Sequence, residues 1–425
     1  MEQTIKQRIA DIQQGNVPAG YRKTNSSVMP IDWKVEILGS IFTARDERVD
    51  NTTDTPLFSL TIENGITEKT ERYEREFLVK KEKNYKKVYP GDFVYNPMNL
   101  RFGAIARYHG SAPCSVSGYY DVFCIKNPSY FGDFIEKLLQ SDILLKEYSN
   151  AATGSLIEKQ RVHFSNFCKI SFIQPPESEI TKLSAILGCC DRVIALKKEL
   201  IAEKKKQKKA LMQKLLNPES GFRLPGFSGE WKKTTLGDLA TKKGEYGINA
   251  PACEYAPGLP RYIRITDIDE HCKFITSNEA YVKISEYQDF LLKPSDIIFV
   301  RTGGTVGKSY AYDSNDGDLV FAGFLIRFNF QSPKADSRFI KQIVSTEEYQ
   351  RWVNIMSARS GQPGINAEEY ASYSFMAPSL QEQQAIVDIL SAADKEIDLL
   401  EQELAQQEQK KKSLMQLLLT GIVRV

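Results

Sequence analysis

The sequence predicts a mixed α/β (α+β) fold in which two β-rich globular domains alternate with two long helices that form an antiparallel coiled coil. Three observations support this prediction. A unit of about 200 residues occurs twice in the 425-residue chain. Each copy ends in an amphipathic stretch of about 40 residues. The rest of each copy contains short runs of β-branched and aromatic residues, with helices expected at 130–148 and near 336–355.

The internal repeat is visible as a nearly constant shift between matching segments. A shift of 203 residues aligns segment 173–216 with the end of the chain, so that Leu187 faces Leu390 and Asp191 faces Asp394. The duplication predicts a pseudo-two-fold relation between the halves. The matching upstream segments are GYRKTNSSVMPIDWKVEILG (20–39) with GFRLPGFSGEWKKTTLG (221–237), YPGDFVY (89–95) with KPSDIIF (293–299), and SVSGYYDVF (115–123) with VFAGFLIRF (320–328).

Start and stop signals divide the chain into five segments. A proline precedes each amphipathic stretch (Pro176 and Pro378), and a turn signal follows each one (Pro218 and Gly421). The N-terminal helix is expected to pack near the distal helix. The segments are an N-terminal helix (1–19), a first globular domain (20–176), a central helix (177–217), a second globular domain (218–378) and a distal helix (379–425).

The two long helices have apolar residues at alternating spacings of three and four, which is typical of a coiled coil. Residues 177–216 hold ten Lys or Arg and five Asp or Glu, a net charge of +5, whereas residues 379–420 hold four and eight, a net charge of −4. Opposite charges favour antiparallel pairing within one chain, although the lysine run 204–209 also fits a solvated face. The interface residues are Leu183, Leu187, Ile194, Ile201, Leu211 and Leu215 in the first helix, and Ile386, Leu390, Ile397, Leu400, Leu404, Leu414 and Leu418 in the second.

Residues 301–309, RTGGTVGKS, come close to a phosphate-binding loop because they follow a strand-like run and end in Gly-Lys-Ser. That pattern requires a glycine where this chain has Thr302. In the other copy, the aligned segment PMNLRFGAI (97–105) keeps only the glycine, with Gly103 facing Gly307. We therefore interpret the segment as a hairpin-like loop between two strands, whose other residues vary freely, rather than as a nucleotide site.

Composition argues against several functional classes. The net charge of +2 confines any basic surface to local patches, and neither a membrane span nor a secretory signal is recognisable. Seven cysteines without a Cys-x-x-Cys pair and three scattered histidines predict no metal site, no disulfide framework and a cytoplasmic location. Neither copy has a motif for catalysis or for a bound cofactor, so we assign no catalytic residue. Asp267 and Asp269 fit turn capping better than catalysis.

Two similar domains without catalytic motifs, held apart by paired helices, suit the recognition of two half-sites on a DNA duplex. Loops rich in Arg, Lys, Asn and Gln suit contacts with phosphates and base edges. Taken singly, each of these residues also fits a solvated surface role. The candidate DNA-binding residues are Asn96, Asn99, Arg101, Arg301, Lys308, Arg359 and Gln362.

The chain resembles the specificity subunit of type I restriction-modification systems over nearly its whole length. The resemblance is carried by LPGFSGEWKKTTLGDLA, YIRITDI, RTGGTVGKS, SGQPGIN and the distal helix that begins PSLQEQQAIVDIL. The central helix begins PPESEITKLSAIL and lacks the Glu-Gln pair that Glu382 and Gln383 retain.

The resemblance implies two target-recognition domains, each reading one half of a bipartite DNA target. It implies that the helices set the gap between the halves and dock two methyltransferase subunits. S-adenosylmethionine would then belong to those subunits, which methylate adenine at N6, and ATP and Mg to endonuclease or translocase subunits. This chain would be non-catalytic. The alternative is a coiled-coil scaffold that binds protein and has no sequence-specific affinity for DNA.

Overall fold

The chain forms two compact units of mixed α/β structure. The computed structural model describes residues 4–24, 28–50, 55–68, 85–127, 131–156, 159–331, 333–358 and 362–425. Unit 1 comprises Met1–Lys198 and Glu403–Val425, and unit 2 comprises Glu199–Gln402, so each unit contains part of both long helices. Among the described residues, no helix combines the length and the apolar character needed to cross a membrane.

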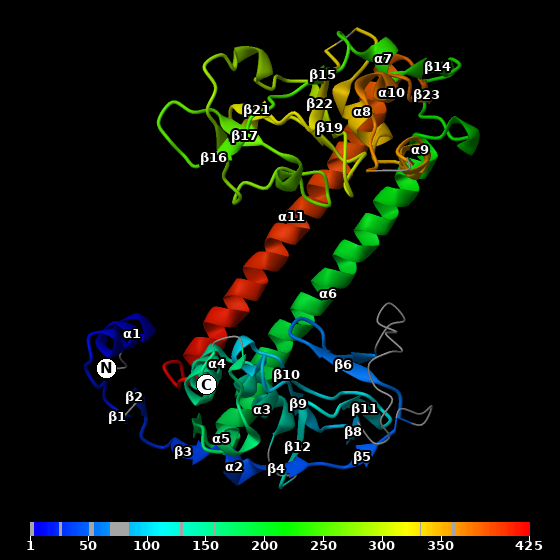
Figure 1. Ribbon diagram of the computed structural model, residues 1–425. Helices are drawn as coiled ribbons and strands as arrows, with labels where there is room; N and C mark the ends of the chain where they lie inside the picture. Colours follow the sequence, from blue (N-terminus) through cyan, green and yellow to red (C-terminus); the bar gives the residue numbers. More distant parts are fainter. Residues whose placement is uncertain are drawn as a thin grey trace. The chain divides into compact units, whose positions relative to one another are not determined.

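Unit 1 is built around a four-stranded antiparallel sheet (Figure 1). Its strand order is β10 (Ile105–Arg107), β9 (Phe93–Tyr95), β12 (Asp121–Ile125) and β4 (Phe42–Arg45). The other strands are β11 (Cys114–Ser117), β8 (Tyr85–Val88) and β5 (Arg48–Val49) in one sheet, and the pairs β6 (Phe58–Thr61) with β7 (Gly65–Glu68), β13 (Ser171–Gln174) with β3 (Lys34–Ile37), and β1 (Tyr21–Lys23) with β2 (Val28–Pro30). The helices are α1 (Ile5–Gln13), α2 (Leu38–Ile41), α3 (Gly132–Leu139), α4 (Asp142–Ala151) and α5 (Phe164–Phe167).

Unit 2 repeats this plan, which confirms the predicted duplication. Its main sheet has the order β15 (Glu245–Tyr246), β22 (Leu325–Asn329), β19 (Asp296–Val300) and β20 (Ser309–Ala311), which matches β4, β12, β9 and β10. The other strands are β16 (Ala252–Cys253), β18 (Tyr281–Val282), β17 (Arg261–Ile263) and β21 (Leu319–Phe321) in a second sheet, and the pair β14 (Lys232–Thr235) with β23 (Ser374–Ala377). The short helices are α7 (Leu236–Leu239), α8 (Ser337–Ile343), α9 (Glu347–Met356) and α10 (Ala367–Ala371).

The two helices expected inside the globular parts are each divided, which corrects the sequence prediction. Segment 130–148 contains α3 and α4, and segment 336–355 contains α8 and α9. A hydroxyl residue starts the second helix of each pair: Ser141 Oγ accepts from the Leu144 amide at 3.4 Å. Thr346 Oγ1 accepts from the Tyr349 amide at 3.3 Å. Such N-caps favour a new helix over continuation of the old one.

The long helices α6 (Glu177–Leu215) and α11 (Leu380–Leu419) run antiparallel within each unit, as predicted from their charges. All thirteen predicted interface residues are buried or half-buried. The lysine run of α6 therefore pairs with carboxylates of the other helix rather than forming only a solvated face. The ion pairs are Lys197–Glu403 (2.6 Å) and Lys198–Glu408 (2.8 Å) in unit 1, and Lys204–Glu396 (2.6 Å), Lys205–Glu401 (2.8 Å) and Lys208–Asp394 (2.5 Å) in unit 2.

Each core combines the start of one long helix with the end of the other. In unit 1, the start of α6 and the end of α11 pack against the main sheet and its helices. In unit 2, α11 supplies the start and α6 the end. The contributions are Leu183, Leu187, Leu418 and Leu419 in unit 1, and Ile386, Leu390, Leu215 and Leu216 at the equivalent positions in unit 2.

An arginine beyond the end of one long helix binds a buried glutamate in the first turn of the other. In unit 2, Arg223 donates two hydrogen bonds to Glu382, at 2.8 and 2.7 Å, and its guanidinium lies 6.0 Å from the centre of the Trp231 ring. In unit 1, Arg424 donates to Glu179 at 2.8 Å. The Trp33 indole N–H donates to the same carboxylate at 2.9 Å.

The unit 1 cluster uses a different arginine from the one that the repeat suggests. Arg22 stands at the position of Arg223 in the matching segments, but it donates to the Trp33 carbonyl at 2.9 Å, while Arg424 has the role of Arg223. The central helix lacks the Glu-Gln pair as a pair: it keeps the glutamate, as Glu179, and has Ile180 in place of the glutamine.

The N-terminal segment contacts the segment that follows α11, as expected. Arg8 of α1 donates to the Ile422 carbonyl at 2.8 Å, and the Tyr21 hydroxyl donates to the Gly421 carbonyl at 2.6 Å.

Candidate nucleic-acid interface

The segment 301–308 is a loop between two antiparallel strands, β19 and β20. A phosphate-binding loop requires a helix after its Gly-Lys-Ser, whereas here a strand begins at Ser309. Gly307 has a φ of +88°, and a Cβ there would lie 2.5 Å from Val353 Cγ1, so glycine is required. Gly103 in unit 1 has a φ of +94° at the equivalent turn. The hairpin-like interpretation is thus confirmed.

Two buried tyrosines fix the base of this loop through its backbone. The Tyr370 hydroxyl accepts from the Gly307 amide at 3.1 Å and donates to the Val300 carbonyl at 2.7 Å. The Tyr349 hydroxyl donates to the Gly307 carbonyl at 3.0 Å. Burial raises the pKa of both tyrosines well above the ordinary value, so both hydroxyls remain neutral donors. The loop side chains take no part in this anchoring.

Arg301 and Gln362 lie on neighbouring loops of unit 2. The Arg301 guanidinium lies over the Tyr246 ring, 4.8 Å from its centre. Its backbone carbonyl accepts from the Ile365 amide at 2.8 Å, which joins the loop to the exposed segment that contains Gln362. Lys308 is half-buried at the far end of the same loop. Arg359 lies outside the described residues.

The three candidates of unit 1 share the loop between β9 and β10. Asn96 Oδ1 accepts from the Met98 amide at 3.0 Å, which gives this side chain a role in the turn itself. Asn99 is exposed. Arg101 donates to Gln160 Oε1 at 2.9 Å, and its guanidinium lies 4.6 Å from the centre of the Phe102 ring. Asn99 is therefore the most accessible polar group of this loop.

The two acidic residues considered for catalysis have structural roles. Asp267 is fully buried and accepts from the Arg264 guanidinium at 2.8 and 2.9 Å. Asp269 Oδ1 accepts from the amides of His271 and Lys273, at 2.9 and 2.7 Å. The turn-capping interpretation is confirmed for Asp269, whereas Asp267 combines capping with a buried ion pair.

Exposed aromatic residues near these loops were missed in the sequence. Tyr246 and Phe324 are exposed beside Arg301, and Phe102 and Tyr119 are exposed in unit 1. Their residue types fit strand interiors, so composition alone gives no warning of exposure. One sequence signal was available: a glycine directly precedes Tyr119 in the first copy of the repeat and Phe324 at the equivalent position of the second copy.

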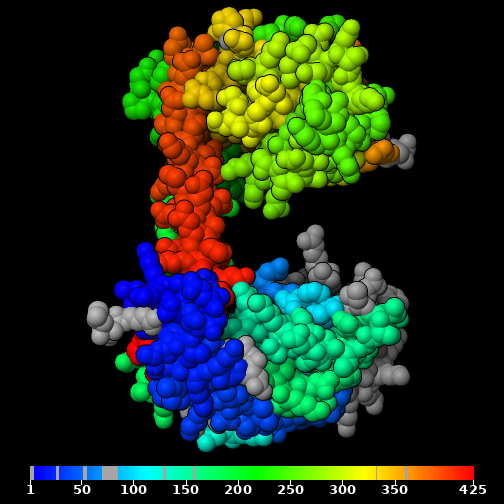
Figure 2. Space-filling model, turned by 90° about the vertical axis from the view of Figure 1, so that its left-hand side faces the viewer, coloured from blue at the N-terminus to red at the C-terminus, as the bar shows by residue number. Residues whose placement is uncertain are grey.

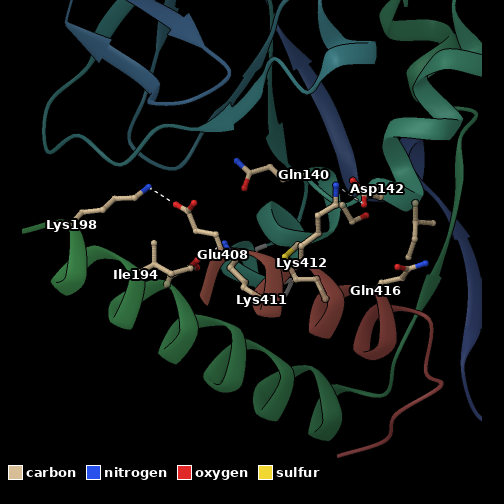
Figure 3. Close-up of a pocket in the computed structure, with 12 residues that line it drawn as sticks. Gln140, Asp142, Ile194, Lys198, Glu408, Lys411, Lys412 and Gln416 are labelled. Atoms are coloured by element: carbon tan, nitrogen blue, oxygen red, sulfur yellow. Dashed lines mark ion pairs between the residues drawn. The ribbon is translucent and has the colours of Figure 1, made fainter. Parts of the chain in front are cut away.

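A cavity of about 410 Å³ in unit 1 lies between α6, α11 and the start of α4 (Figure 3). Its charged lining is already paired: Lys198 binds Glu408 at 2.8 Å, and Lys412 binds Asp142 at 3.2 Å. Burial alone would raise the pKa of Asp191, but the hydrogen bonds and charges of two lysines together leave that pKa below the ordinary value. These ion pairs connect the two long helices with each other and with α4. We therefore interpret the cavity as part of a structural contact within unit 1 rather than as a reactive site.

Residues 228–409 match the family model of the type I restriction modification DNA specificity domain. Over 278 residues, the chain is 26% identical to the specificity subunit of the type I restriction enzyme MjaVIII of Methanocaldococcus jannaschii, covering 61% of this chain and 63% of that protein. The chain is thus similar to type I specificity subunits over part of its length, and its residues 228–409 fit the DNA specificity domain of that family. A second relative, the StySPI specificity subunit of Salmonella potsdam, is 30% identical over 131 residues, 29% of this chain and 28% of that protein.

The chain spans less than two thirds of either of these curated relatives, as the shares of 63% and 28% show. Solved structures support the fold of the specificity-subunit family over a longer range. The S subunit of M. genitalium has a TM-score of 0.56 at 14% identity, covering 93% of this chain and 97% of that chain. A chain from a structure on the assembly and conformational transition of the type I R-M system has a TM-score of 0.57 at 13% identity, covering 93% and 99%.

Proposed function

We propose that this chain is the sequence-specific DNA-binding subunit of a type I restriction-modification complex, in which each recognition domain reads one half of a bipartite target. The observation that carries this proposal is the repeated sheet with divergent loops. β9–β10 and β19–β20 hold loops of the same topology, yet one presents Asn99 and the other Arg301. A shared scaffold with different polar side chains suits the reading of two different short sequences.

The setting of Arg301 suits a base or phosphate contact. A guanidinium over an aromatic ring keeps its charge while the ring restricts its orientation. A preoriented guanidinium can bind guanine O6 and N7 together, which is the commonest specific contact in the major groove.

Both long helices offer surfaces for partner subunits. On α6, the exposed residues Val193, Leu196 and Leu200 follow a spacing of three and four. On α11, whose outer surface is visible in orange to red in Figure 2, Ile389 and Leu399 are exposed. We propose that two methyltransferase subunits dock on these helices, whose paired segments set the gap between half-sites. S-adenosylmethionine, and ATP and Mg where a nuclease takes part, then belong to the partners.

The direct test is base-resolution mapping of methylated adenines in a methylation-free host. The host expresses the methyltransferase encoded beside this chain, with and without the chain itself. A split motif that appears only with the chain supports the proposal and reveals both half-sites and the gap. If the methyltransferase is active but its methylation pattern is the same with and without the chain, the result would favour the scaffold alternative.

Arg301→Ala is expected to weaken binding to the target by about 1–3 kcal/mol, with the loss confined to one base position of one half-site. The measurement is the Kd of the assembled complex for duplexes in which each base pair is replaced in turn. Lys232→Ala removes an exposed cation from β14 of the same unit and serves as the control. Equal weakening on all sequences would instead identify a phosphate contact.

A further inference from the structure

The same β-turn joins equivalent strands in the two units. In unit 1 the turn Ser117–Tyr120 leads into β12, and the Tyr120 amide donates to the Ser117 carbonyl at 3.0 Å. In unit 2 the turn Ala322–Leu325 leads into β22, and the Leu325 amide donates to the Ala322 carbonyl at 2.8 Å. A shift of 205 residues superimposes the two turns, so they are copies of one feature.

Each copy of this turn presents an aromatic side chain at its third position. Tyr119 is 45% exposed and Phe324 is 59% exposed. A single exposed apolar residue is ordinary on a protein surface and needs no explanation. Here the exposure recurs at equivalent positions although the neighbouring residues have diverged. Because leaving apolar area in water gains no stability, a shared use of these rings is the simpler account.

Both aromatic residues lie where the candidate recognition loops begin. In unit 2, the Arg301 amide donates to the Phe324 carbonyl at 3.0 Å, so the two residues are direct cross-strand neighbours. In unit 1, Tyr95 at the end of β9 pairs with Asp121, which places the turn beside the start of the loop at Asn96. Each turn therefore lies at the same end of the two central strands of its main sheet as the loop that carries the polar candidates.

We propose that Tyr119 and Phe324 are specificity-determining residues, each of which packs against the thymine methyl group of an A·T pair in its half-site. This inference rests on the proposed function. An aromatic ring supplies the apolar contact that distinguishes thymine in the major groove, which guanidinium and amide groups do not provide. Phe324 makes an apolar contact alone, whereas the Tyr119 hydroxyl can also bind a base edge or a phosphate. The equivalent turns of the two domains would thus contact the bases in different ways, through an apolar ring alone in one domain and through a ring with a hydroxyl group in the other.

The test uses the full chain assembled with its methyltransferase subunits and duplexes carrying the mapped target. Each thymine is replaced in turn by uracil, which removes only the methyl group. In the wild type, one uracil in each half-site is expected to weaken binding measurably. Phe324→Ala is expected to weaken binding to the unmodified target about tenfold and to abolish the uracil effect in one half-site. Tyr119→Ala is expected to do the same in the other half-site only.

Two further variants separate contact from folding. Phe324→Leu keeps an apolar side chain and is expected to retain most of the affinity. Phe222→Ala removes another exposed aromatic ring of unit 2, outside the recognition loops, and is expected to leave the Kd unchanged.

Three outcomes would contradict the inference. If the wild type prefers its target but Phe324→Ala and Tyr119→Ala bind like the wild type with the same uracil effects, the inference fails and the proposed function stands. If the variants weaken target and unrelated duplexes equally, the rings contact the DNA backbone and do not determine specificity. If the wild-type complex has no sequence preference, the proposed function fails as well.

Discussion

Arg223→Ala is expected to destabilise unit 2 by about 3–5 kcal/mol, because it leaves a buried carboxylate without its counter-ion. The Glu382 side chain is 3% exposed and loses two hydrogen bonds from the guanidinium. The equivalent change in unit 1, Arg424→Ala, leaves Glu179, which is 4% exposed but keeps its bond from Trp33. We therefore expect a smaller loss in unit 1 than in unit 2.

Hydrogen exchange of the backbone amides gives a separate measurement for each unit. Protection of the amides of residues 232–239 from exchange reports on unit 2, and protection of the amides of residues 34–41 reports on unit 1. Lys209→Ala is the matched control, since this exposed lysine pairs with the exposed Glu347 at the surface of the same unit and is expected to contribute far less to stability. Adding Glu382→Gln to Arg223→Ala removes the unpaired charge and should restore much of the protection. Equal effects of Arg223→Ala and Lys209→Ala would refute this account of the buried pair.

Leu187→Ala is expected to destabilise unit 1, and Leu390→Ala unit 2, each by about 2–5 kcal/mol. Both leucines are fully buried in the core of their unit and are equivalent in the repeat. Each substitution leaves a cavity where the start of a long helix meets the main sheet. Leu196→Ala, on an exposed position of α6, is the control and should change stability by less than about 0.5 kcal/mol.

The measurement is the denaturant midpoint of each unit, followed by hydrogen exchange of its core strands. β12 represents unit 1 and β22 represents unit 2. Loss of protection in β22 on Leu187→Ala, of the same size as in β12, would contradict the assignment of one core to each unit.

Features with a long sequence pattern could be predicted from the sequence. The duplication, the antiparallel pairing of α6 with α11 and the fold class depend on many residues at regular spacing, so single exceptions do not obscure them. The charge difference between the helices also predicts their pairing, and ion pairs such as Lys204–Glu396 confirm it.

Features that depend on contacts between distant residues could not be predicted. Arg424 and Glu179 are 245 residues apart, and no local pattern connects them. The helix breaks at Ser141 and Thr346 were missed because periodicity continues across a single capping residue. The exposure of Phe324 was missed because its residue type is common in strand interiors.

The candidate site was predictable in location but not in detail. The repeat identified the loops, since a loop that diverges within a duplicated scaffold stands out. It could not show that Asn96 is engaged in its own turn or that Tyr246 supports Arg301. The roles of the candidate residues in DNA binding stay predictions.

The way Tyr349 and Tyr370 hold the loop at Gly307 has a consequence for how such a protein evolves. The hydroxyls bind only main-chain groups of Val300 and Gly307, at the base of the loop. These bonds do not depend on the side chains at positions 302–305, so substitutions there can change what the loop contacts while the tyrosines still hold its base. Val306 is different, because its side chain packs against the core of unit 2.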